Sequence, residues 1–301
     1  MRITDDFKLR VVDALLDQRA RFGGTDGAFS KQFGIHQSVF SLLKKKQIEG
    51  QILKETKWIE LARELDVNPT ERKWNMARTE VFESISADVT FCQENAKAMI
   101  FVDEPEIGKT HTAKYLSRTL ENCFYIDCSQ SKSKTAFIRA LAKAIGVDNR
   151  GTYAKMKENI KYYLRMLHKP VVILDEAGDL SYGAFLDIKE FWNATEGVCG
   201  WYMMGADGLR TMIDRGINRE QVGFREIFSR YSARYMSIVP RDRNERLQFY
   251  SKLITDVISV NTDDKSIIPG LVRKCLASDA TGTIGGLRRA ETLLILEDHA
   301  A

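Results

Sequence analysis

The 301-residue sequence lacks the features that mark membrane, secreted and disulfide-rich proteins. It has no apolar run near the ~18–20 residues that span a bilayer, and its charged start, Met1–Arg10, has no signal-peptide core. Its five cysteines form no C-x-x-C pair, so neither zinc sites nor disulfides are expected. Internal repeats and low-complexity tracts are also missing. We therefore expect a cytoplasmic protein that makes no use of a membrane and keeps its thiols reduced and buried.

The composition is that of an ordinary globular protein, with 44% hydrophobic and 29% charged residues. Its length allows two or three domains. The net charge of +4 says little, but basic residues outnumber acidic ones in residues 1–74, and Lys44–Lys46 form a run. Such clusters attract phosphate backbones, although a solvated helix face has the same composition. Charge alone therefore favours a nucleic-acid partner only slightly.

Apolar residues in the first 69 positions recur with the 3.6-residue period of helices. Helices are predicted over 5–22, from Thr25 and Asp26 through Phe33, over His36–Lys46 and over Gln51–Leu65, with stops at Gly23-Gly24, Gly34 and Asn68-Pro69. The side chains predicted to point inward from the last two helices are Val39, Phe40, Leu42, Leu43, Ile52, Trp58, Ile59, Ala62 and Leu65.

Two short helices joined by a turn that contains glycine are typical of a helix-turn-helix. Residues 28–43 resemble the lambda-repressor-like version of this unit. Its second helix enters the major groove, where polar side chains meet base edges or phosphates. The DNA contacts predicted here are Gln37, Ser38, Ser41, Lys44 and Lys45. The alternative is a helical interaction domain that touches no DNA.

Strands and helices alternate after residue 97. Apolar runs predict strands at Ala98–Val102, Cys123–Asp127, Val171–Leu174, Gly200–Met204 and Tyr235–Val239, and helical periods occur at Lys134–Ile145 and Thr152–Leu167. The alternation predicts an α/β fold with a parallel sheet covered by helices on both faces. The expected domains are an all-α helix-turn-helix domain (1–69), a linker with one helix over Met76–Asn95 (70–97), an α/β core (98–240) and a helical lid (241–301).

The strongest local pattern is Asp103–Thr110, which follows a predicted strand and precedes a predicted helix, His111–Leu120. In a Walker A loop, backbone N–H groups hold the phosphates, a lysine reaches the β- and γ-oxygens, and a hydroxyl binds Mg²⁺. Acids stand at two positions where glycine is usual, Asp103 and Glu106, so weakened affinity or an inactive site is the alternative. The residues predicted to contact ATP are Pro105, Glu106, Ile107, Gly108, Lys109, Thr110 and His111.

A second pattern supports the first. Val171–Glu176 is a buried strand that ends in two adjacent acids, as in a Walker B segment. Asp175 and Thr110 are the predicted Mg²⁺ residues, and Glu176 is positioned to polarise the attacking water. With Lys109 retained as well, the sequence predicts that ATP is hydrolysed as well as bound.

The spacing of later polar residues indicates the AAA+ class. Asp207, after the strand that follows Walker B, is the predicted sensor 1, because an asparagine common at this point is replaced by Ala206. Arg230 is the predicted arginine finger, which stabilises transition-state charge in a neighbouring subunit, with Arg225 and Arg234 as alternatives. The segment 282–289 resembles sensor 2, with Arg288 preferred to Arg289 as its catalytic, ATP-contacting arginine.

A helix-turn-helix unit fused to one AAA+ module resembles the transposition ATPases of the phage Mu B type, with IstB- and TnsC-type proteins as wider relatives. The resemblance implies ATP-bound subunits that assemble as a helical filament or ring on double-stranded DNA. It also implies recruitment or activation of a transposase, with hydrolysis clearing the assembly. Each motif is shared by all AAA+ proteins. The resemblance to this family therefore rests on the order of the domains.

The same resemblance predicts DNA contacts from the segment after the second strand, through Lys132, Lys134 and Thr135. An ordinary solvated loop with a hydroxyl helix cap is the alternative. Two other functions stay open: a replication initiator or helicase loader of AAA+ type, and a regulator that binds nucleotide without hydrolysing it.

Overall fold

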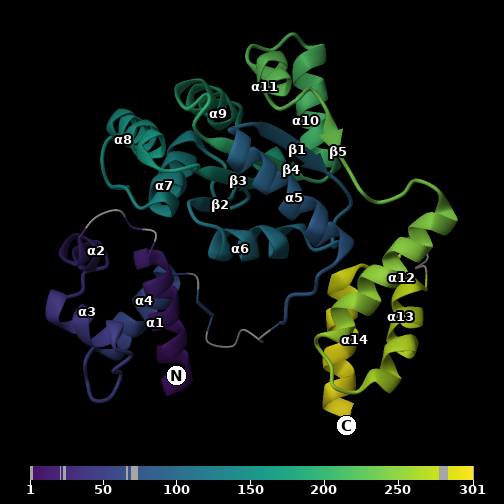
Figure 1. Ribbon diagram of the computed structural model, residues 1–301, viewed down its shortest axis with the longest axis horizontal. Helices are drawn as coiled ribbons and strands as arrows, with labels where there is room; N and C mark the ends of the chain where they lie inside the picture. Colours follow the sequence, from purple (N-terminus) through teal and green to yellow (C-terminus); the bar gives the residue numbers. More distant parts are fainter. Residues whose placement is uncertain are drawn as a thin grey trace. The chain divides into compact units, whose positions relative to one another are not determined.

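The computed structural model describes residues 3–20, 22, 25–65, 67–68, 74–277 and 284–300. The chain forms two compact units, Met1–Lys73 and Trp74–Ala301, which are described separately below (Figure 1). Three predicted features lie outside the described residues: the stop at Gly23-Gly24, the proline of Asn68-Pro69, and residues 282 and 283 of the sensor 2 pattern.

The first unit is helical: α1 (Asp5–Ala20), α2 (Asp26–Gln32), α3 (Gln37–Lys44) and α4 (Glu55–Glu64). α2 and α3 are shorter than predicted because polar side chains cap them, whereas α4 begins at Glu55 without a side-chain cap. The Thr25 hydroxyl accepts the N–H of Ala28 at the start of α2, and His36 Nδ1 accepts the N–H of Ser38 at the start of α3. Gly34, in the turn between these two helices, has a positive φ of 61°, which glycine adopts without strain.

Two predictions about the core of this unit are wrong. Ile59 is 48% exposed and Leu42 is 38% exposed, whereas both were expected to face inward. Leu61 is fully buried instead. The cause is the register of α4: Trp58, Leu61 and Ala62 share the i, i+3, i+4 face that packs against the rest of the unit, and Ile59 falls outside it.

The second unit contains a five-stranded parallel sheet in the order β2-β3-β4-β1-β5. The strands are β1 (Ala98–Val102), β2 (Cys123–Asp127), β3 (Val171–Asp175), β4 (Gly200–Gly205) and β5 (Tyr235–Met236). The predicted α/β class with a parallel sheet is confirmed. β5 is shorter than the predicted Tyr235–Val239. The N–H groups of Ile238 and Val239 donate to the side chain of Asp103 and do not pair with β1.

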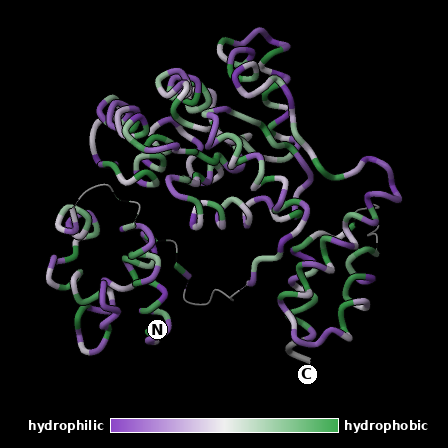
Figure 2. The backbone as a smooth tube through the Cα atoms, viewed as in Figure 1, coloured by the Kyte–Doolittle hydropathy of each residue, from purple (hydrophilic) through white to green (hydrophobic). Residues whose placement is uncertain are grey.

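The two faces of the sheet pack against different helices, and alternate strand residues supply each face. Val172 and Leu174 point to one face, whereas Val171 and Ile173 point to the other. Figure 2 shows the hydrophobic residues concentrated along the strands. The first face packs against α7 (Lys134–Ile145), α8 (Tyr153–Met166), α9 (Tyr182–Ala194), α10 (Asp207–Asn218) and α11 (Phe224–Arg230).

The opposite face packs against α5 (Glu80–Asn95) and α6 (Lys109–Thr119) and shares its core with the lid helices α12 (Arg243–Ser259), α13 (Ile268–Leu276) and α14 (Leu287–Ala300). The helix predicted over Met76–Asn95 begins at Glu80, because the Thr79 hydroxyl accepts the N–H of Phe82 and caps it there. All five cysteines are buried, as expected. Among the described residues, no helix is both long and apolar enough to cross a bilayer.

Candidate nucleotide-binding site

The residues of the two phosphate-binding patterns meet at one edge of the sheet. Parallel strands end at the same edge, so the loop after β1 and the acids after β3 are brought together. Gly108 precedes α6 with a positive φ of 97° and Ile107 is fully buried beneath the loop. The loop therefore has the strand–turn–helix setting that a phosphate site requires.

Asp103, one of the two acids at positions where glycine is usual, has a structural role. Its side chain is buried, and Oδ2 accepts the N–H groups of Ile238 (2.6 Å) and Val239 (3.1 Å). Oδ1 accepts the N–H of Glu104 at 2.8 Å. The carboxylate thus ties the start of the loop after β1 to the chain after β5. The glycine usual at this position is not needed, since the backbone φ of Asp103 is not positive.

We expect Asp103→Ala to lower the free energy of unfolding by about 2–4 kcal/mol, because buried N–H groups lose their acceptor. Asp103→Asn keeps the shape and one acceptor oxygen, so it should lose roughly half as much. Chemical denaturation, monitored by the fluorescence of buried Trp201, measures both variants. Equal stability of Asp103→Ala and the parent chain would contradict this role.

Two further acids of the loop bind the lid. The Glu104 carboxylate accepts hydrogen bonds from Arg246 (2.8 Å) and from the hydroxyl of Tyr250 (2.6 Å), both on α12. Glu106 has a positive φ of 62°, and its carbonyl accepts the N–H of Leu287 at 2.9 Å. The structure therefore explains why glycine is favoured at Glu106, and it assigns to Glu104 a lid contact that the sequence pattern did not indicate.

Arg288, the predicted sensor 2 arginine, lies beside the loop. Its Nη1 is 3.6 Å from Glu106 Oε1, and its side chain is 82% exposed. Gly286 packs so closely on Glu106 that a Cβ at residue 286 would overlap it. The start of α14 is thus placed at the phosphate loop, with Arg288 paired to an acid of that loop.

Lys109 is buried and folded back into the loop. Its Nζ donates to the carbonyl oxygens of Asp103 (2.9 Å) and Glu104. Burial lowers the pKa of this ammonium, and the nearby carboxylates of Asp103 and Glu176 oppose the shift. Lys109 therefore has to turn outward from these carbonyls to reach a phosphate.

Thr110 and Asp175 form the oxygen pair that could hold a metal. The Thr110 hydroxyl donates to Asp175 Oδ2 at 2.7 Å, and the Tyr125 hydroxyl donates to the same oxygen at 3.0 Å. Asp175 is only 1% exposed; burial raises the pKa of its carboxyl, and the hydrogen bonds from Thr110 and Tyr125 oppose the rise. A hydroxyl and a carboxylate are the hard oxygen donors that Mg²⁺ prefers, so these residues fit the predicted ion. Tyr125 is a contributor that the sequence did not indicate.

Glu176 follows directly, in the left-handed region with φ of 49°. Its backbone N–H donates to Asp175 Oδ1 at 3.0 Å, which fixes the turn after β3. Burial raises the pKa of the Glu176 carboxyl, and the neighbouring Asp175 raises it further. A carboxylate with a raised pKa is a better proton acceptor than an ordinary glutamate.

The residues predicted as sensor 1 and arginine finger each lie close to a neighbouring side chain. Asp207, the first residue of α10, is 91% exposed and lies 3.8 Å from Arg210. Arg230, the last residue of α11, lies with its guanidinium 5.1 Å from the ring centroid of Trp192. The alternatives Arg225 and Arg234 are exposed. The assignments of Asp207 and Arg230 stay predictions.

The DNA contacts predicted in the first unit share one exposed helix face. Gln37, Ser38, Ser41, Lys44 and Lys45 all lie on α3 or directly after it, and all are exposed. Lys44 also pairs with Asp26 on α2 at 2.8 Å, and Ser38 Oγ lies 2.7 Å from His36 Nδ1. This face is available to a partner, and whether the partner is DNA stays a prediction.

The second predicted DNA segment leads into α7. Ser133 caps this helix by accepting the N–H of Ala136. Lys132 pairs with Asp179 at 2.9 Å, Lys134 Nζ lies 5.1 Å from the ring centroid of Tyr153, and Thr135 is exposed. The hydroxyl cap of the alternative interpretation is therefore present, and contact of Lys132, Lys134 and Thr135 with DNA stays a prediction.

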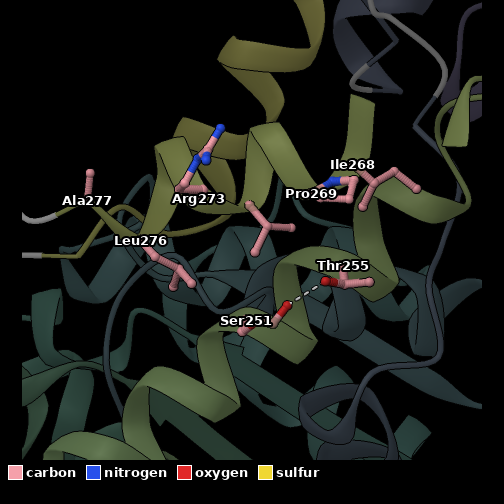
Figure 3. A pocket seen from close by; sticks show the side chains of 8 residues that line it. Ser251, Thr255, Ile268, Pro269, Arg273, Leu276 and Ala277 are labelled. Carbon is pink, nitrogen blue, oxygen red and sulfur yellow. Dashed lines mark hydrogen bonds between the residues drawn. The ribbon is translucent and has the colours of Figure 1, made fainter. Parts of the chain in front are cut away.

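An apolar groove of about 680 Å³ lies in the lid, between α12 and α13 (Figure 3). Ile268, Val272 and Leu276 line it, and Arg273 stands at its rim. None of its lining residues belongs to the P-loop or to the Walker B turn. The chemistry predicted above therefore belongs to the sheet edge and not to this groove.

Comparison with known families supports the assignment of the core. Residues 92–213 match a family model described as an AAA domain. No curated protein matches the chain. The matched range includes Lys109, Thr110, Asp175 and Glu176, and together with the parallel sheet it supports a P-loop NTPase of AAA+ fold.

Proposed function

We propose that this AAA-domain protein hydrolyses ATP, assembles on double-stranded DNA and recruits or activates a transposase. One observation carries the ATPase part: the hydroxyl of Thr110 and the carboxylate of Asp175 share a hydrogen bond beside Lys109 and Glu176. Two patterns 65 residues apart thus form one site. The transposition part rests on the fusion of this core to a unit that resembles a helix-turn-helix.

In the proposed reaction, Lys109 leaves its carbonyl partners and binds the β- and γ-phosphates. Thr110 and Asp175 would hold Mg²⁺, which would supply positive charge to neutralise the phosphates. Glu176 accepts a hydrogen bond from the attacking water and orients it. Arg288 leaves Glu106 and closes the lid onto the nucleotide, and Arg230 acts on the nucleotide of a neighbouring subunit.

The test is assembly on duplex DNA with ATP, followed by electron microscopy and sedimentation. We expect ATP-dependent filaments or rings on the parent chain and none on Lys109→Ala, which lacks the phosphate-binding ammonium. Monomers alone on the parent chain would reject the assembly function. Release of phosphate, measured with DNA and transposase present, separates this function from that of a regulator that binds nucleotide without turnover.

Glu106→Gly should tighten ATP binding about 10-fold, because it removes a negative charge beside the phosphates and a Cβ that limits the approach of the backbone to the ligand. It also releases Arg288 from its ion pair. Titration with a fluorescent ATP analogue measures the dissociation constant. Glu106→Ala is the matched control, since it removes the charge but keeps the Cβ, and it should gain less. Unchanged or weaker binding by Glu106→Gly would contradict the expectation.

A further inference from the structure

A cleft of about 470 Å³ lies beside the start of α9 and one face of α10. Its aromatic side consists of Tyr182 and Phe224, whose rings are parallel with centroids 5.8 Å apart. Arg215 on α10 and Arg219, which directly follows that helix, line it with Thr211. The cleft thus combines an aromatic surface with two guanidinium groups and a hydroxyl.

Both arginines are exposed, and within the described parts of the chain neither side chain forms an ion pair or a hydrogen bond. Two acids of this region are engaged elsewhere: Asp214 accepts the hydroxyl of Tyr235 at 2.7 Å, and Glu226 pairs with Lys189 at 3.0 Å. The stretch 207–234 carries six arginines and no lysine. Guanidinium groups bind phosphate oxygens in a bidentate manner, which ammonium groups do not.

The cleft is held in shape by close packing. Gly216 lies directly against Phe224, and a Cβ at this position would overlap the ring. Phe224 also stacks on buried Phe185 with centroids 4.9 Å apart, and the Tyr182 hydroxyl donates to the carbonyl of Val222 at 2.9 Å. The arginines therefore project from a preformed scaffold, which lowers the entropy lost when a ligand binds.

This cleft continues the surface that carries Lys132 and Lys134. The N–H of Ser181, just before α9, donates to the Lys132 carbonyl at 2.8 Å. The Lys134 side chain lies against Gly183, so that a Cβ there would come within 2.6 Å of its Cδ. Lys132 and Lys134 thus contact the residues on either side of Tyr182, which lines the cleft with Arg215 and Arg219.

We propose that the cleft binds the sugar–phosphate backbone of duplex DNA, with Arg215 and Arg219 on phosphate oxygens and the Tyr182 ring against the sugar. This inference rests on the DNA-binding function proposed above and extends it to residues that no sequence pattern indicated. A polyanion fits better than a single small anion, because Lys132 and Lys134 contact the residues on either side of Tyr182, while Arg215 and Arg219 line the cleft with it.

The experiment compares Arg215→Ala/Arg219→Ala with the parent chain, bound to a labelled duplex in the presence of a non-hydrolysable ATP analogue. Anisotropy titrations at several salt concentrations give the affinity and its salt dependence. We expect at least roughly 10-fold weaker binding at low salt and a log–log salt slope reduced by about 2, one for each lost phosphate contact. Arg215→Lys/Arg219→Lys keeps both charges and should restore the slope but only part of the affinity.

Arg118→Ala/Arg165→Ala is the matched control, because it removes two exposed arginines from α6 and α8. Its slope and its ATP turnover should equal those of the parent chain. An equal loss in this control would overturn the proposal by assigning the effect to net charge. So would a loss of DNA-free turnover with unchanged DNA affinity, which would place the arginines on a neighbouring subunit's nucleotide. Absence of DNA binding by the parent chain would instead reject the function proposed above.

Discussion

Glu176→Gln is expected to reduce ATP turnover about 10²–10⁴-fold, the range lost when a positioned general base is removed. The glutamine keeps the shape of the side chain but cannot accept a proton. Since Glu176 does not belong to the phosphate loop, the dissociation constant for ATP should change by less than about 3-fold. Steady-state phosphate release and an equilibrium ATP titration on the same preparation measure both quantities.

The raised pKa of Glu176 allows a second test of its role, the pH dependence of ATP turnover. Only the deprotonated carboxylate orients water, so turnover by the parent chain should fall as the pH drops through that pKa. Burial and Asp175 raise the pKa, so the acid limb should lie above the ordinary range of a glutamate. Glu176→Gln that keeps parental turnover would show that the chain uses another base. An acid limb in the ordinary glutamate range would show that the water is oriented by a less perturbed group.

The sequence could predict those parts of the fold that depend on local pattern. Continuous apolar runs bounded by polar residues identify buried parallel strands, so Ala98–Val102 and Cys123–Asp127 were located to the residue. Helix ends were less accurate, because caps such as Thr79 and His36 act through side-chain hydrogen bonds that periodicity does not show.

In the candidate site too, the residues that depend on local pattern were predictable, whereas the contacts between distant segments were not. Lys109, Thr110, Asp175 and Glu176 were predictable, since each stands at a fixed distance from a strand end. The contacts of Asp103 with Ile238 and of Glu104 with Tyr250 were not, because they join segments more than 130 residues apart. An acid in a phosphate loop looks unfavourable in sequence, and only its partners show whether it faces the ligand.

Arg230→Ala is expected to leave ATP binding intact and to reduce DNA-stimulated turnover about 10³-fold or more, as for other arginines that act in trans. The structure gives a physical reason for preferring Arg230 to its neighbours. Its guanidinium stacks on Trp192 at 5.1 Å, which limits its rotamers and leaves less entropy to be lost when it meets a neighbouring nucleotide. Arg230→Lys should be almost as defective, since an ammonium lacks the planar donors.

Mixing experiments separate action in trans from a structural effect. Arg230→Ala subunits still bind ATP, and Lys109→Ala subunits still carry the finger. Neither should turn over ATP alone, whereas a mixture should recover activity where an intact finger meets an ATP-bound neighbour. Arg225→Ala and Arg234→Ala serve as parallel variants, because both arginines are exposed and flank Arg230. Full turnover by Arg230→Ala together with complementation by one of the other two would move the finger to that residue. Because recovery depends on contact between subunits, it would also demonstrate the assembly that the finger requires.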